Sequence, residues 1–152
     1  MVHKVFVDGL NKYVRFPEDP RMSEFHKFLT QYAVEIILRN KTFLKHSRKV
    51  SITAVQDIQQ DKAYYDVYTD FFYCEIETGL KHSYDDLKER LKKADKHVFV
   101  ILPNQDIKGR YLKALTVGKR TFHLKICTVD EFTYELRVFL NNLFRDHREN
   151  SL

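Results

Sequence analysis

The chain has 152 residues, a formal net charge of +5 and 43% hydrophobic residues, which fits one folded domain of ordinary size. With only 4 Gly and 3 Pro, its composition excludes a collagen-like or low-complexity chain. No apolar stretch approaches the roughly 18 residues of a membrane helix, and the N-terminal apolar run is too short for a signal peptide. We therefore expect a single domain over residues 1–152 that has no membrane partner.

The first half of the chain predicts a β-hairpin, a helix and then three strands. Alternating apolar residues surround Asp8-Gly9, a favoured turn dipeptide. From Ser23 to about Asn40, apolar residues recur with the spacing of an amphipathic helix. Three later segments are rich in β-branched and aromatic residues and predict strands, the last two joined tightly through Thr69-Asp70: 50–55, 64–68 and 71–76.

The second half predicts alternating helices and strands. Ser83 to Asp86 has the spacing of a capping box at the start of a helix that carries Leu87, Leu91 and Ala94 inward. The continuous apolar run 98–102 is typical of a strand covered on both faces. The remaining elements are a short helix over 107–117, a strand over 122–127 and a final helix over 130–145, after which residues 147–152 are expected to fray.

This order of elements predicts an α/β fold with a mixed central β-sheet flanked by helices. Within the single domain, residues 1–20 form an N-terminal hairpin extension, residues 23–132 form the core, and residues 130–146 form the C-terminal helix. The cysteines Cys74 and Cys127 lie in apolar surroundings without CxxC spacing, which favours buried thiols in a reducing compartment. A cytoplasmic location is therefore expected.

Charge is distributed unevenly along the chain. Residues 61–77 contain five carboxylates and one Lys, although the chain as a whole is basic. On the predicted strands, Glu75 and Glu77 project from one face, and the hairpin brings Asp66 close to them. Clustered carboxylates repel one another unless a cation lies between them, and hard oxygen ligands suit Mg²⁺ or Mn²⁺. The alternative is that these side chains merely face solvent, although the surrounding apolar strands disfavour it.

The stretches Tyr65-Asp66-Val67, Tyr73 to Gly79 and Val98 to Asn104 together resemble the PD-(D/E)XK nuclease superfamily. The resemblance covers roughly Ser23 to Phe132. It implies a restriction-endonuclease-like core that cleaves DNA with the help of Mg²⁺ or Mn²⁺. In that family the motif Asp and the next acidic residue hold the metal, and these correspond to Asp66 and Glu75.

The sequence departs from the family pattern at two positions. Tyr65 replaces the motif Pro, and Glu77 stands where the family usually has a catalytic Lys. Glu77 is then a third metal ligand, or a basic residue such as Lys81 or Lys88 has taken over the role of the Lys, or catalysis has been lost. The family often adds an acidic ligand from its first helix, and between Glu24 and Glu35 we favour Glu35. Either residue is otherwise a solvated flank of the helix.

Two basic segments are candidates for contact with DNA phosphates. The first lies between Arg39 and Lys49 and contributes Lys45, Arg48 and Lys49; the second contributes Lys108, Arg110 and Lys113. Each is otherwise an ordinary solvated surface. No GxxxxGK[ST] or GxGxxG motif is present, so no nucleotide cofactor is expected, and the His spacing does not support a zinc site.

Three functions remain open from the sequence. The first is a divalent-metal-dependent DNA endonuclease in which Asp66, Glu75, Glu77 and Lys81 are catalytic candidates, and in which a homodimer would cut two strands. The second is a non-catalytic DNA-binding or assembly module that retains the nuclease fold. The third is a protein-binding role through the N-terminal hairpin.

Overall fold

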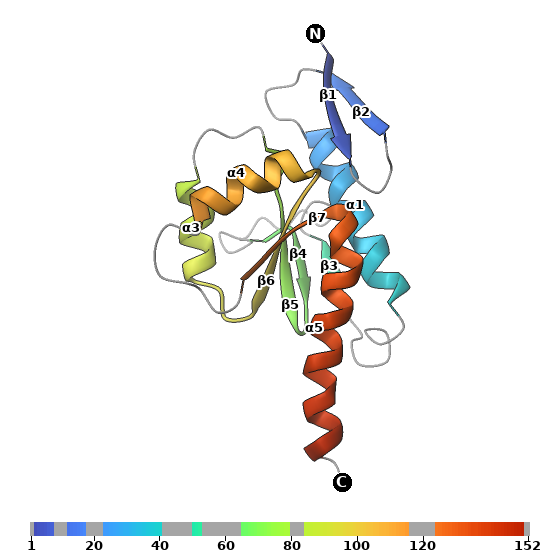
Figure 1. Cartoon of the computed structure of the whole chain (residues 1–152), viewed down its shortest axis with the longest axis vertical. Coiled ribbons are helices and arrows are strands. Elements are labelled where there is room, and N and C mark those ends of the chain that lie inside the picture. The colour runs from blue at the N-terminus through green and yellow to red at the C-terminus, as the bar shows by residue number, and fades with distance from the viewer. Residues whose placement is uncertain are drawn as a thin grey trace.

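The computed structural model describes residues 2–7, 12–17, 23–40, 50–52, 65–79, 84–115 and 124–150. Figure 1 shows the arrangement of the elements. In chain order they are β1 (Val2–Val7), β2 (Lys12–Pro17), α1 (Ser23–Arg39), β3 (Val50–Ile52), β4 (Val67–Thr69), β5 (Phe72–Ile76), α3 (Asp85–Lys92), β6 (His97–Leu102), α4 (Gln105–Leu115), β7 (Leu124–Thr128) and α5 (Val129–Asn150).

Among the described residues, β3 to β7 form one five-stranded sheet in sequential order. β3 pairs antiparallel with β4, and β4 pairs antiparallel with β5; the connection between β4 and β5 is too short for a parallel crossover. β6 and β7 lie parallel to β5, since α3 and α4 return the chain to the same end of the sheet. The predicted α/β fold with a mixed sheet and flanking helices is therefore confirmed.

The two faces of the sheet carry different helices. α1 and α5 pack against each other and cover one face, whereas α3 and α4 lie on the other side (Figure 1). β1 and β2 pair antiparallel in a separate two-stranded sheet, as the alternation around the N-terminal turn predicts. The turn dipeptide Asp8-Gly9 itself lies outside the described residues.

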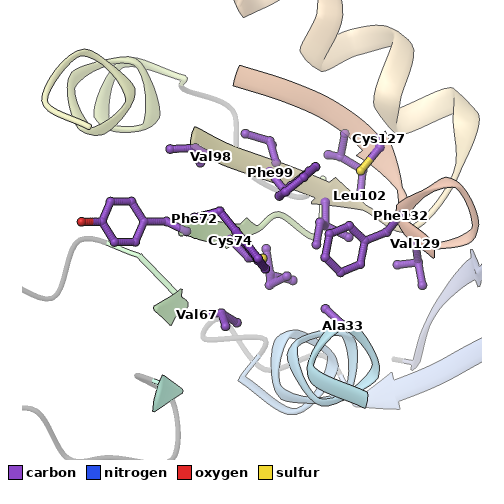
Figure 2. Close-up of a cluster of buried hydrophobic side chains, with 14 of the residues drawn as sticks. Ala33, Val67, Phe72, Cys74, Val98, Phe99, Leu102, Cys127, Val129 and Phe132 are labelled. Atoms are coloured by element: carbon purple, nitrogen blue, oxygen red, sulfur yellow. The ribbon is translucent and has the colours of Figure 1, made fainter. Parts of the chain in front are cut away.

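The core between the sheet and the α1–α5 layer is rich in aromatic side chains. Phe99 on β6 makes edge-to-face contacts with Phe72 and with Phe132 and Phe139 of α5, at centroid distances of 5.2 to 5.5 Å. Figure 2 shows Ala33 of α1 pointing toward the sheet residues of the same core. Edge-to-face pairs add to the stabilisation from area burial, so this layer helps to stabilise the packing of α5 on the sheet.

Helix ends differ from the predicted ones where capping groups decide them. α3 has Tyr84 as its N-cap residue without a side-chain cap hydrogen bond, and Ser83 of the expected capping box lies outside the described residues. α4 begins two residues earlier than predicted because Asn104 Oδ1 accepts a hydrogen bond from the Ile107 N–H, at 3.0 Å. α5 extends to Asn150, five residues beyond its predicted end at Arg145, and no Gly or Pro interrupts it.

The start of α5 carries a capping box that the sequence analysis missed. Thr128 Oγ1 accepts a hydrogen bond from the Glu131 N–H, and Glu131 Oε1 accepts one from the Thr128 N–H. This reciprocal pair satisfies two donors at the helix start.

Within the described part of the chain, none of the helices has the length and apolarity that a membrane span requires.

Candidate functional site

Asp66 is fixed beside Glu75 by hydrogen bonds on either side of that residue. The Asp66 N–H donates to the Cys74 carbonyl at 3.0 Å, and Asp66 Oδ2 accepts from the Ile76 N–H at 2.7 Å. The carboxylate thus takes a donor that a continuing strand would have bonded, which is why β4 begins only at Val67 and the predicted strand over 64–68 starts too early. These bonds place the backbone of Asp66 next to that of Glu75.

His26 of α1 also reaches this site. Its Nε2 lies 3.0 Å from Asp66 Oδ1, and the side chains of His26 and Asp66 are 28% and 17% exposed. From the sequence alone, His26 is expected to be a surface or packing residue. The available signal was its position at helical spacing from Ala33 and Ile37, which places it on the face of α1 that meets the sheet.

Glu75 and Glu77 lie on the same face of β5, as the two-residue period predicts, and are only 3% and 2% exposed. The Glu77 N–H donates to the Ile101 carbonyl at 3.0 Å, which extends the pairing with β6 by one residue. Burying two carboxylates so close together is costly without a compensating positive charge or hydrogen bonds.

Arg90 of α3 supplies that positive charge. Its Nη1 donates to Glu75 Oε1 at 3.0 Å, and its Nη2 lies 4.0 Å from Glu77 Oε1. From the sequence, Lys81 and Lys88 are the expected basic residues near the motif, and Arg90 is not among them. Arg90 is identifiable only from the fold, which packs α3 over the face of β5 that carries both glutamates.

Two tyrosines complete the surroundings of these carboxylates. Tyr111 of α4 donates its hydroxyl to Glu77 Oε2 at 3.2 Å, and Tyr65 donates its hydroxyl to the Arg90 carbonyl at 2.7 Å. Burial, together with nearby Glu77, raises the pKa of Tyr111 well above its usual value of 10. Burial and the charge of Glu75 raise the pKa of Tyr65 to about 12. Both phenols therefore remain protonated hydrogen-bond donors at neutral pH.

The fit of these residues to a divalent cation is partial. Asp66 and Glu75 each carry hard oxygen ligands of the kind that Mg²⁺ prefers, but the Asp66 carboxylate contacts His26 of α1 and the Glu75 carboxylate contacts Arg90 of α3. Glu77 instead faces the donors Arg90 and Tyr111. Among the described residues, no group of three or more His, Cys, Asp or Glu side chains is arranged to hold a metal ion. The roles of Asp66, Glu75 and Glu77 as metal ligands therefore stay predictions.

Glu35 is not brought to this site. It follows His26 by nine residues, about 13 Å along α1, and its carboxylate pairs with Arg39 at 3.7 Å on the helix surface. It lines a pocket of about 240 Å³ between α1 and α5, together with Tyr32 and Arg137. Lys81 lies outside the described residues.

The two basic segments differ in what the structure describes. Lys45, Arg48 and Lys49 lie outside the described residues. On α4, Arg110 and Lys113 are exposed, whereas Lys108 is engaged with Glu131 Oε1 at 2.7 Å. Two of the three predicted DNA-contacting residues on α4 are therefore accessible to a partner.

Comparison with known proteins adds no assignment, since no family model, curated protein or solved structure matches this chain at a significant level.

Proposed function

We propose that this protein is a divalent-metal-dependent phosphodiesterase that acts on DNA and has a restriction-endonuclease-like core. The observation that carries the proposal is that Asp66 is hydrogen-bonded to Cys74 and Ile76, the two neighbours of Glu75, where the resemblance to PD-(D/E)XK nucleases expects the metal ligands. The order of α1, three antiparallel strands, α3 and a parallel strand supports it.

In this proposal the protein's own residues have separate tasks. Asp66 and Glu75 would hold Mg²⁺ or Mn²⁺. The metal ion would lower the pKa of a bound water and shield the charge on the scissile phosphate. The backbone N–H of Ile76 and the ring of His26 hold Asp66 in place. Arg90 brings to these carboxylates the positive charge that Glu77 cannot provide at the family's Lys position. Exposed Arg110 and Lys113 on α4 would contact the DNA backbone.

The alternative is a non-catalytic DNA-binding or assembly module with the same fold. The contact between Arg90 and Glu75 favours it, because an internal cation already compensates a carboxylate that a metal would need. Both proposals include DNA as the partner, so cleavage distinguishes them.

The test is nicking and cleavage of supercoiled, linear and branched DNA with Mg²⁺ or Mn²⁺. The proposal expects cleavage by the wild-type protein and its loss in Asp66→Asn, which keeps an acceptor for the Ile76 N–H but removes the charge. Asp70→Asn, an exposed change on the connection between β4 and β5, is the matched control and should leave cleavage intact. A wild-type protein that binds DNA but cuts none of these substrates would establish the alternative.

A further inference from the structure

The pocket of about 240 Å³ lies between α1 and α5, the two helices that pack against each other on one face of the sheet (Figure 1). Small-molecule sites typically have volumes of about 300–1,000 Å³, so this pocket suits a ligand at the small end of that range. Asp66, Glu75 and Glu77 are not among the described residues that line it. The pocket is therefore separate from the carboxylates of the candidate site.

Two arginine side chains line the pocket, one from each helix. Arg39 belongs to the last turn of α1, and Arg137 lies on α5. Arg39 contacts Glu35 Oε2 at 3.7 Å, whereas Arg137 is exposed and has no carboxylate within ion-pair distance among the described residues. Two positive charges around one pocket repel each other, so an anion between them would be stabilised by both.

The contact between Arg39 and Glu35 does not commit Arg39 to that partner. The two side chains are 80% and 63% exposed, and an exposed ion pair of this kind contributes little to stability. With two arginines and one glutamate, the lining has a formal net charge of +1. The carbonyl end of α1 also lies at the pocket and disfavours anions. The guanidinium groups therefore have to supply the attraction for a ligand.

The other lining residues add hydrogen-bond donors and an apolar wall. Thr133 carries a hydroxyl, Tyr32 a phenol and Asn40 an amide, each of which can donate to an anion. The half-buried side chains of Tyr32 and Ile36 supply apolar surface beside these donors. The planar fork of a guanidinium matches the oxygens of a phosphate group, which it binds through two parallel N–H donors.

We propose that the pocket between α1 and α5 binds the phosphate group of a small organic phosphate, with Arg39 and Arg137 as the anion-binding residues. The organic part of the ligand would lie against Tyr32 and Ile36. This inference is independent of the proposed phosphodiesterase, because none of the pocket residues is assigned a role in cleavage.

The test is a titration of the isotope-labelled full chain with inorganic phosphate, glycerol phosphate or succinate, followed by backbone amide NMR shifts at constant ionic strength. Glycerol phosphate should give saturable shifts around Asn40 and Thr133 and should bind more tightly than the other two anions. If inorganic phosphate binds at least as tightly, the ligand is free phosphate and the organic part of the proposal is wrong. Succinate binding as tight as that of glycerol phosphate would overturn the preference for phosphate.

Variants of the charged residues give opposite expected results. Arg137→Gln should weaken the binding of glycerol phosphate about tenfold, as expected for the loss of a hydrogen bond to a charged group. Glu35→Gln should tighten it, because the change removes a negative charge from the pocket and releases Arg39. Arg145→Gln is the matched control: Arg145 is an exposed arginine of the same helix, about 12 Å further along α5, and does not line the pocket. It should have a much smaller effect than Arg137→Gln.

Three outcomes would overturn the proposal. The first is the absence of saturable shifts with both phosphates. The second is equal weakening by Arg137→Gln and Arg145→Gln, which would show attraction to the general positive charge of the protein. The third is weaker binding by Glu35→Gln, which would make Glu35 a contact of the ligand instead of an opposing charge. All three substituted side chains are exposed, so the variants should keep the fold, and the same spectra report it.

Discussion

Gly79 lies directly against Ile107 of α4: a Cβ atom added at Gly79 would come within 2.7 Å of the Ile107 side chain. Gly79 also has a φ of +87°, a conformation that side-chain-bearing residues rarely adopt. Gly79 follows Glu77 by two residues, and this contact packs it against α4, the helix that carries Tyr111. The glycine therefore helps to hold the buried end of the site together.

Gly79→Ala should lower the free energy of unfolding by about 2 kcal/mol, since the left-handed conformation alone costs roughly 1–2 kcal/mol and Ile107 must also shift. Gly109→Ala is the matched control. A Cβ there meets no atom within 4 Å, and Ala inside a helix is favoured over Gly by about 1 kcal/mol. Urea unfolding should therefore show a lower free energy of unfolding for Gly79→Ala and a higher one for Gly109→Ala. Equal changes in the two variants would contradict the close contact at Gly79.

Glu77→Lys, which restores the family's residue type at this position, should destabilise the protein. Glu77 is 2% exposed and Arg90 Nη2 is 4.0 Å away, so a Lys would place a second positive charge beside the guanidinium. Breaking a buried charge pair typically costs about 3–5 kcal/mol. Glu77→Gln, as the size-matched control, should cost less, and thermal or urea unfolding gives the comparison. A Glu77→Lys variant as stable as the wild-type protein would contradict the described packing.

Glu131 should make stability depend on pH. Burial raises its pKa, but hydrogen bonds from Lys108 and from the Thr128 N–H outweigh that effect and lower it below the ordinary 4.5. Because the pKa of Glu131 is lower in the folded protein than in the unfolded chain, the stabilisation by its carboxylate is fully present above the pKa of the unfolded chain. This stabilisation is lost as the pH falls through the pKa of the folded protein. Glu131→Gln should therefore destabilise the protein at neutral pH and much less at about pH 3.

Thr128→Val is the comparison for that experiment. It removes the Oγ1 acceptor of the Glu131 N–H but keeps the shape of the side chain, so it should cost about 1 kcal/mol at both pH values. Urea unfolding at the two pH values measures both variants. If the loss in free energy of unfolding for Glu131→Gln does not change with pH, Glu131 stabilises the protein through packing and not through its charge.

Divalent cations should raise the melting temperature if Asp66 and Glu75 form the metal site. Binding to the folded state alone stabilises it by about 2.7 kcal/mol at a hundredfold excess over Kd. Asp66→Asn and Glu75→Gln should each abolish this shift. Glu35→Gln should leave it unchanged, because Glu35 pairs with Arg39 elsewhere on α1. A shift that survives Asp66→Asn would place the cation at another site.

DNA binding should weaken with salt, with a log–log slope of about −0.9 per phosphate contact. Replacing Arg110 and Lys113 of α4 with Gln should make that slope shallower by up to about two such units. Lys108→Gln should affect stability more than the slope, since Lys108 is engaged with Glu131. Replacing the sequence-based candidates Lys45, Arg48 and Lys49 together should also make the slope shallower. Slopes that none of these changes alters would remove both segments from the DNA interface.

Most helices and strands follow from local residue patterns. The apolar period of α1, the continuous apolar run of β6 and the alternation around the N-terminal turn each favour one conformation through neighbouring residues alone. The α/β class follows from their order, because short connections give antiparallel pairs and helical crossovers give parallel ones. That the backbones of Asp66 and Glu75 are neighbours was also predictable, since both residues lie on one predicted hairpin.

The partners of these carboxylates were not predictable, because they depend on which helix packs over which face of the sheet. Arg90 is 15 residues from Glu75 and Tyr111 is 34 residues from Glu77, and no local pattern relates them. Glu35 and His26 illustrate the same limit: both belong to α1, but only His26 points to Asp66 once the helix is docked. A sequence records which side chains can carry charge, whereas long-range packing decides which of those charges are buried together.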